Sequence, residues 1–167
     1  SNYCLGCHSM QYARYERAAN DLGIPNNVFE ENLLVGETKI GQLMTISMSK
    51  DDGSVWFGTA PPDLTLSARL RGPDWLYNYL RGFYADGKRP YGVNNVIFAD
   101  VGMPHVLASL QGVCADAPQF GVEPKVDPIS GKIVSASGCS EFSTKGSMTP
   151  EEYDEAIYNL VNFLEYV

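Results

Sequence analysis

Five consecutive residues near the start of the chain constrain its fold more than any other feature. Cys4, Leu5, Gly6, Cys7 and His8 form the pattern C-x-x-C-H. This pattern is typical of covalent haem attachment, because two thiols three positions apart on one helical turn can both reach the vinyl groups at one edge of a porphyrin. The adjacent imidazole then points at the iron. The motif therefore predicts a covalent haem c held by Cys4 and Cys7 and ligated by His8.

Two other kinds of site also use closely spaced cysteines. A thioredoxin-like redox pair follows a strand in a βαβ unit, which the residues around Cys4 and Cys7 do not provide. A closed zinc site needs two further ligands, and Cys114 and Cys139 are too far apart in sequence to form a second such pair. The haem interpretation is therefore favoured over a redox dithiol or a non-haem metal-binding module.

The iron needs a second axial ligand, and the sequence offers several candidates. Met103 and His105 lie in one loop with Gly and Pro, whereas Met44 and Met48 lie in another flexible segment. Met103 is preferred, because Pro104 biases it to extended geometry and a thioether ligand raises the reduction potential, as suits an electron carrier. His105 is then expected to be a hydrogen-bonding neighbour of the site or a surface residue.

The remaining cysteines, Cys114 and Cys139, are expected to form a disulfide. Haem attachment to C-x-x-C-H occurs after export, so the protein should reach an oxidising compartment in which a disulfide persists. Closing a loop of about 25 residues contributes on the order of 3 kcal/mol in the chain-entropy model. Two separate buried thiols are the alternative.

Length and charge narrow the remaining possibilities. A chain of 167 residues is expected to form a single domain, and its 44% hydrophobic content is that of an ordinary folded protein. The formal net charge of −8 argues against nucleic acid as a partner and favours a basic or neutral one, since nucleic-acid binding depends on cationic residues. The chain starts at Ser1 rather than Met, just before the motif, so we expect a processed or partial piece of a longer protein.

Periodicity and breaker residues predict a mainly α domain over residues 1–167, with long irregular loops. Helices are expected over residues 4–22, 27–34 and 63–70 and from residue 74, and loops over 36–58, with a tight turn at 51–53, and over 85–102. Residues 113–146 are expected to form a small β-hairpin insertion closed by the disulfide. An N-cap at Thr149 followed by Pro150 predicts a closing helix over residues 149–167.

Four blocks of the sequence resemble cytochrome c1, the haem subunit of the bacterial and mitochondrial bc1 complex. The blocks are Cys4-Leu5-Gly6-Cys7-His8-Ser9; Ala60-Pro61-Pro62-Asp63-Leu64 followed by Ala68-Arg69; Trp75-Leu76-Tyr77-Asn78-Tyr79-Leu80-Arg81; and Asn94-Asn95-Val96-Ile97-Phe98 running into Gly102-Met103-Pro104-His105-Val106-Leu107. They occur in the family's order and cover most of the chain, and the Gly-Met-Pro-His form is typical of a bacterial subset. The resemblance implies a cytochrome c-like haem domain.

The resemblance also implies roles for individual residues. Cys4 and Cys7 would hold haem c by thioethers, His8 and Met103 would be the axial ligands, and Arg69 would approach a haem propionate. The residues that would line the haem edge are Pro61, Pro62 and Leu64. Taken without the resemblance, Arg69 could equally lie on a solvated helix face, and the residues at the haem edge could be ordinary turn and core residues.

As a whole, the resemblance implies one-electron transfer within a quinol–cytochrome c reductase. The haem would accept an electron from a Rieske iron–sulfur protein and pass it to a soluble cytochrome c, and no substrate bond is broken at this chain. Cytochrome b would be a further partner, in a dimeric complex. The haem domain would lie on the periplasmic side of the respiratory membrane, anchored by a C-terminal helix beyond Val167.

A free periplasmic c-type carrier, or a haem sensor that belongs to no complex, is the alternative function. The continuation of the gene separates the two, since an apolar run of about 20 residues soon after Val167 would support the anchored subunit. Its absence would favour the free carrier.

Overall fold

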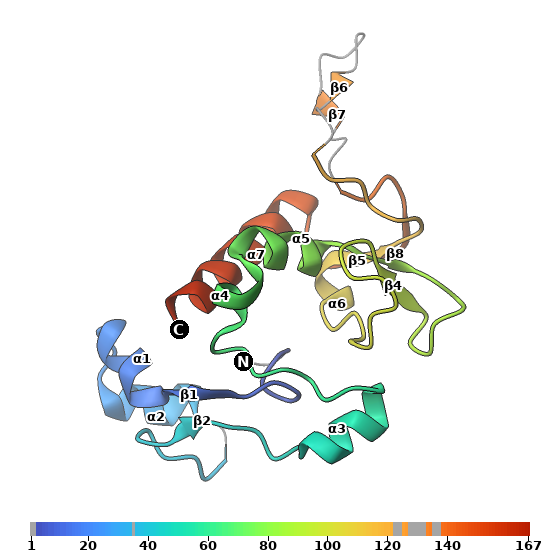
Figure 1. Ribbon diagram of the computed structural model, residues 1–167. Coiled ribbons are helices and arrows are strands. Elements are labelled where there is room, and N and C mark those ends of the chain that lie inside the picture. The colour runs from blue at the N-terminus through green and yellow to red at the C-terminus, as the bar shows by residue number, and fades with distance from the viewer. Residues whose placement is uncertain (1–2, 35, 122–124, 127–132, 135–137) are drawn as a thin grey trace.

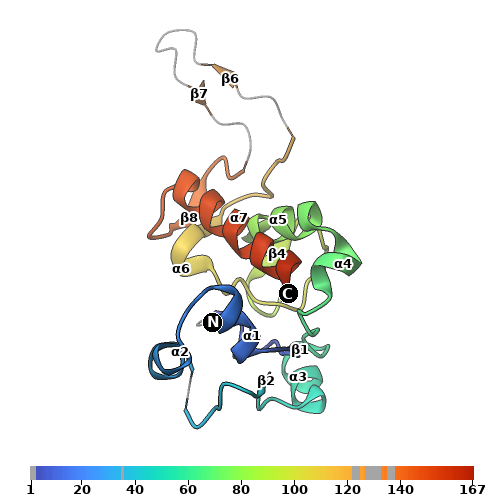
Figure 2. The ribbon, with the colours of Figure 1, turned by 90° about the vertical axis from the view of Figure 1, so that its left-hand side faces the viewer.

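The computed structural model describes residues 3–34, 36–121, 125–126, 133–134 and 138–167, and its elements form two groups (Figures 1 and 2). The first group contains β1 (Met10–Arg14), α1 (Tyr15–Asp21), α2 (Asn26–Leu33), β2 (Leu43–Met44) and α3 (Lys50–Phe57). The second group contains α4 (Ser67–Arg71), α5 (Pro73–Arg81), α6 (Ala108–Gln111), α7 (Pro150–Tyr166) and a sheet of β3 (Phe83–Ala85), β4 (Val93–Asn95), β5 (Gly112–Cys114) and β8 (Phe142–Lys145).

The predicted helix over residues 4–22 is wrong in its middle, where β1 lies. Met10 pairs with Met44 across β1 and β2, and both side chains are buried. The backbone N–H of Gln11 donates to the Asp63 carboxylate at 2.8 Å. Because strand preference depends on partners across the strand, these distant residues override the local helical spacing, which continues only in α1.

The tight turn predicted at residues 51–53 is wrong, because these residues form the first turns of α3. The Ser49 hydroxyl accepts a hydrogen bond from the backbone N–H of Asp52 at 3.0 Å and caps the helix. Asp51 and Asp52 favour a helix start because carboxylates stabilise the positive end of the helix dipole. The same residue types are common in turns, so composition alone led to the wrong choice.

The closing helix, α7, agrees with its prediction. It packs with α5 in the larger of two clusters of buried hydrophobic side chains, which we call the main core. Thr149 and Glu152 form a reciprocal capping box, with Pro150 in the first turn. The Tyr153 hydroxyl donates to the Leu80 carbonyl at 2.9 Å, next to an ion pair of Arg81 and Asp154 at 2.6 Å. The buried side chains of α7 that pack in this core are Tyr153, Ile157, Val161 and Leu164.

The small sheet has the strand order β4-β3-β5-β8. β3 pairs antiparallel with β4 and parallel with β5, and β5 pairs antiparallel with β8. The loop predicted over residues 85–102 is therefore wrong for β4, whose three residues are all buried. Helices contain more residues than strands, but the domain also contains a four-stranded sheet. The expected mainly α class is therefore confirmed only in part.

In the segment with the predicted hairpin, β6 (Lys125–Val126) and β7 (Ile133–Val134) pair antiparallel. Both strands lie well away from the two groups in Figures 1 and 2. The two ends of residues 113–146 belong to the second group of elements, because β5 and β8 are strands of its sheet. Along the part of the chain that the structure describes, no helix is both long and apolar enough to cross a bilayer.

Candidate functional site

The C-x-x-C-H motif forms one tight turn before β1. The backbone N–H groups of Cys7 and His8 donate to the Cys4 carbonyl, at 3.1 and 2.9 Å. Both cysteines are free and half-buried. Burial raises the pKa of the Cys4 thiol above its ordinary value, which keeps this thiol protonated near neutral pH. The turn thus presents two thiols and one imidazole from five consecutive residues.

The ring of His8 is held by a distant segment. His8 is only 8% exposed, and its Nδ1 lies 2.7 Å from the backbone carbonyl oxygen of Pro62. A carbonyl oxygen can only accept, so Nδ1 carries the proton and Nε2 has the lone pair. Metal-ligating histidines typically have this arrangement, in which one ring nitrogen donates to a carbonyl and the other binds the metal. Pro62 therefore acts on the site through its carbonyl, a role that sequence reasoning missed.

Other bonds hold the segment around Pro62 against the start of the chain. The backbone N–H of Leu64 donates to the Ser9 carbonyl at 2.8 Å. The Asp63 carboxylate accepts from Gln11, as described above, and its other oxygen accepts from the Thr65 hydroxyl at 2.6 Å. These contacts set the position of the carbonyl that orients His8.

Met103 lies on the loop that follows β4. Its side chain is half-buried and packs against a small cluster that contains Phe83, Val93 and Val101. The Tyr79 hydroxyl donates a hydrogen bond to the Met103 Sδ at 3.4 Å. Burial raises the pKa of Tyr79 to about 12, so the phenol keeps its proton near neutral pH.

The residue before Met103 must be small. A Cβ atom placed on Gly102 would lie 2.8 Å from the backbone carbonyl oxygen of Phe57 at the end of α3. A glycine at this position thus lets the Met103 loop approach the first group of elements.

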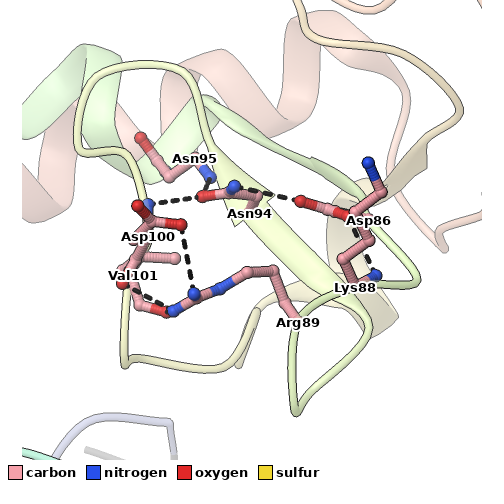
Figure 3. A network of polar contacts seen from close by, with 7 residues as sticks. All are labelled: Asp86, Lys88, Arg89, Asn94, Asn95, Asp100 and Val101. Carbon is pink, nitrogen blue, oxygen red and sulfur yellow. Dashed lines mark hydrogen bonds and ion pairs between the residues drawn. The ribbon is translucent and has the colours of Figure 1, made fainter.

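Two asparagines of β4 organise the loop between β4 and Met103 (Figure 3). The Asn94 side-chain oxygen accepts from the backbone N–H groups of Asn95 and Asp100, both at 2.9 Å, and its amide donates to Asp86 at 3.1 Å. The Asn95 side-chain oxygen accepts from the backbone N–H groups of Ile97 and Phe98, at 2.9 and 3.2 Å, and its amide donates to the Tyr79 carbonyl at 2.8 Å. Hydrogen bonds from the Lys88 backbone and the Asn94 side chain lower the pKa of Asp86.

Arg89 clamps the same loop from the opposite side (Figure 3). Its guanidinium donates to the Asp100 carboxylate at 3.1 Å, to the Asp100 carbonyl at 2.7 Å and to the Val101 carbonyl at 3.2 Å. Asp100 has a φ of 60°, an uncommon conformation for a residue other than glycine. Sequence reasoning missed Arg89, because an arginine within an apparently irregular segment carries no signal of the backbone that it binds.

The rival ligands have other surroundings. His105 is buried, its Nε2 lies 3.0 Å from the Gly112 carbonyl, and its ring stacks on Phe83 with centroids 4.7 Å apart. Burial lowers the pKa of His105 to about 4, although the bond to Gly112 opposes this shift. His105 is thus a buried hydrogen-bonding residue and not a surface one. Met44 is buried in the main core opposite Met10.

The residues assigned only by resemblance lie in different places. Arg69 is exposed on α4, and its approach to a propionate stays a prediction. Leu64 is half-buried against the main core, and Pro61 is also half-buried. Met48, the remaining rival ligand, is half-buried near Gly53 of α3.

Cys114 and Cys139 are joined as a disulfide, with Cα atoms 5.3 Å apart and a sequence separation of 25. Cys114 is fully buried in β5, which pairs with β3 at Tyr84. Both cysteines are therefore engaged with each other and leave no thiol for a second zinc knuckle.

The donor atoms on these segments fit a covalently held haem c. Two free thiols share one turn with an imidazole whose Nε2 carries the lone pair, and a thioether lies on a loop fixed by hydrogen bonds. No group of three or more His, Cys, Asp and Glu side chains arranged to hold a metal ion occurs among the described residues. Imidazole and thioether side chains are both known axial ligands of a haem iron.

The sequence is similar to two curated proteins, and no family model matches it. It is 48% identical over 169 residues to the protein named cytochrome c1 from Allochromatium vinosum, and the match covers 99% of this chain and 65% of that protein. It is 39% identical over 165 residues to the protein named ammonia monooxygenase gamma subunit from Nitrosomonas europaea, with 99% of this chain and 63% of that protein covered. The chain thus spans slightly less than two thirds of the length of either relative.

Proposed function

The chain belongs to the cytochrome c1 family, and from this premise we propose that it transfers single electrons through one covalent haem c. The electron comes from a Rieske iron–sulfur protein and passes to a soluble cytochrome c, within a quinol–cytochrome c reductase of the respiratory chain. The observation that carries the proposal is the His8 ring, whose Nδ1–H is bound by the Pro62 carbonyl so that Nε2 is available beside two free thiols.

Each part of the site has one task in this proposal. Cys4 and Cys7 bind the porphyrin by thioethers, and His8 and Met103 are the axial ligands of the iron. The bound haem supplies the one-electron redox chemistry. The chain holds His8 in one tautomer, through Pro62, and surrounds the Met103 sulfur with apolar side chains and one hydroxyl. Thioether ligation and an apolar site both favour a high reduction potential.

The propionate and haem-edge assignments remain part of the proposal. Arg69 is exposed, so its guanidinium is free to approach a propionate at the edge of the haem. Pro61, Pro62 and Leu64 belong to the segment that is tied to the start of the chain next to His8. That position supports their proposed place along the haem edge.

The assembly is proposed from the family. The chain works beside cytochrome b and the Rieske protein in a dimeric complex at the respiratory membrane, with its haem domain on the periplasmic side and a membrane anchor outside residues 1–167. The Nitrosomonas relative is named as a subunit of another oxidising system, ammonia monooxygenase. Affinity purification of the full-length protein separates the possibilities: cytochrome b and Rieske subunits should copurify, whereas ammonia monooxygenase subunits, or no partner at all, would contradict the proposed complex.

Charge supports a basic electron acceptor. The formal net charge of −8 attracts a cationic cytochrome over distances beyond direct contact. Stopped-flow reduction of a basic soluble cytochrome by the reduced complex should therefore slow steeply as ionic strength rises. A rate that does not change with salt would contradict electrostatic docking.

The most direct test of the cofactor is a haem stain after denaturing electrophoresis, combined with the visible spectrum of the reduced protein. The proposal expects haem that stays attached to the denatured chain and a sharp reduced α band. Haem that is released by denaturation would contradict covalent attachment, and a protein without any haem would favour a non-haem metal-binding module.

A further inference from the structure

We propose that Tyr79 is a positioning residue that raises the reduction potential, because its hydroxyl donates a hydrogen bond to the Met103 sulfur. The inference rests on the proposed function, since it takes Met103 as an axial ligand of the iron. Tyr79 does not touch the iron and acts only through the ligand.

The contact leaves the sulfur able to serve both partners. The Tyr79 hydroxyl lies 3.4 Å from the Met103 Sδ, within reach of a hydrogen bond to sulfur. A thioether sulfur is a weak acceptor with two lone pairs. One pair accepts the phenolic hydrogen, and the other remains for the metal. A hydrogen bond and iron ligation at Met103 are therefore compatible.

The phenol ring is fixed on both sides. It stacks on Trp75 with centroids 4.8 Å apart and planes inclined by 9°, and its other neighbour Phe83 lies edge-on at 5.5 Å. Phe83 is almost fully buried and stacks in turn on His105. The ring therefore has little freedom to swing its hydroxyl away from the sulfur.

The backbone links the same tyrosine to the loop of the ligand. The Tyr79 carbonyl accepts from the Asn95 side-chain amide at 2.8 Å, while the Asn95 side-chain oxygen holds the backbone N–H groups of Ile97 and Phe98. One asparagine thus ties the end of α5 to the loop that leads to Met103. Both the helix that carries the Tyr79 hydroxyl and the loop that carries the Met103 sulfur are therefore held in place.

The effect on potential follows from the charge of the iron. A hydrogen bond to the sulfur withdraws electron density from it and weakens its donation to the metal. Weaker donation destabilises ferric iron more than ferrous iron, so the reduction potential rises. Hydrogen bonds around a haem ligand tune the potential in this way. The surroundings of Phe83, Val93 and Val101 are apolar, so the dipole of the hydroxyl is poorly screened.

The test is Tyr79→Phe in the full-length protein in its membrane complex, by redox titration of the haem. Phenylalanine keeps the ring contacts with Trp75 and Phe83 and removes only the hydroxyl. We expect the reduction equilibrium to shift against reduction by up to about tenfold, which lowers the potential by about 59 mV for a one-electron couple. The matched control is Tyr153→Phe, which removes a buried hydroxyl bonded to the Leu80 carbonyl, and its potential should not change.

Two further measurements decide between the possible outcomes. In the reduced Tyr79→Phe protein, the strongly upfield methyl resonance of a ligated methionine should persist, which shows that the potential changed without loss of the ligand. In a Met103→Leu background, Tyr79→Phe should have little further effect, because the acceptor sulfur is gone.

An unchanged potential in Tyr79→Phe, together with a large fall in Met103→Leu, would overturn the role of Tyr79 and leave the proposed ligand intact. An equal fall with and without the Met103 sulfur would also overturn it. No change in Met103→Leu itself would overturn the proposed ligation, and the role of Tyr79 with it.

Discussion

The turn that carries His8 and the loop that carries Met103 each present one proposed axial ligand, but they are built in different ways. The turn closes on itself, since the Cys4 carbonyl accepts from the backbone of Cys7 and His8. The Met103 loop depends on side chains from other segments, chiefly Arg89, Asn94 and Tyr79.

The comparison shows where each ligand gains its precision. The attachment turn is built from five consecutive residues, and the hydrogen bond of His8 to the distant Pro62 carbonyl decides the tautomer and orientation of its ring. The position of Met103 depends on several hydrogen bonds from other segments, and each of them contributes only a modest free energy. Changes in the turn should therefore abolish the site, whereas changes around the loop should tune it.

The largest effect is expected for the attachment turn. Replacing Cys4 and Cys7 together by alanine removes both thioether bonds, so no haem should remain on the chain after denaturing electrophoresis. The matched control, with Cys114 and Cys139 replaced by alanine, should keep its haem. Covalent haem on the first variant would show that the turn is not the attachment site.

Met103→Leu should have the next largest effect, now on the loop. Loss of the thioether removes an axial ligand that stabilises ferrous iron, so the reduction equilibrium should shift by on the order of 1,000-fold, or about 180 mV downward in a redox titration. Met44→Leu and Met48→Leu are the matched controls and should leave the potential near that of the unmodified protein. An unchanged potential and spectrum in Met103→Leu would transfer the ligand assignment to Met44 or Met48.

Removing the disulfide should affect neither ligand and so separates stability from potential. Replacement of Cys114 and Cys139 by alanine frees a loop of 25 positions and should lower the free energy of unfolding by about 3 kcal/mol, measured by denaturant titration. The reduction potential should stay the same. A fall in potential would mean that loss of the disulfide at β5 also displaces the Met103 loop. It would then be harder to distinguish the Met103 loop from the turn that carries His8.

The smallest effect is expected for Arg89→Gln, which loosens the loop without touching Met103. Loss of the charged donor to the Asp100 and Val101 carbonyls should destabilise the closed loop by about 1–2 kcal/mol, so the ferric iron should bind added imidazole about 5–30 times more tightly. Lys88→Gln, at an exposed neighbouring residue, should leave this affinity unchanged. Equal affinities in the two variants would show that the clamp does not hold the ligand.

Local signals predicted part of the fold well. The capping box of Thr149 and Glu152 marks the start of α7, because its interactions join residues three apart. Local signals failed at β1 and β4, where short segments become strands only because partners from elsewhere pair with them. The turn predicted at residues 51–53 failed for another reason, since Ser49 turns the same acidic residues into the start of a helix.

The sequence by itself determined the proposed attachment site, since Cys4, Cys7 and His8 are neighbours and one helical turn is enough to bring their side chains together. It also singled out Met103, from the residues beside it. Only the tertiary structure decided which nitrogen of His8 carries the proton and which hydroxyl reaches the Met103 sulfur. Pro62 and Tyr79 act across 54 and 24 positions of the chain, and contacts over such separations depend on packing that local spacing does not encode.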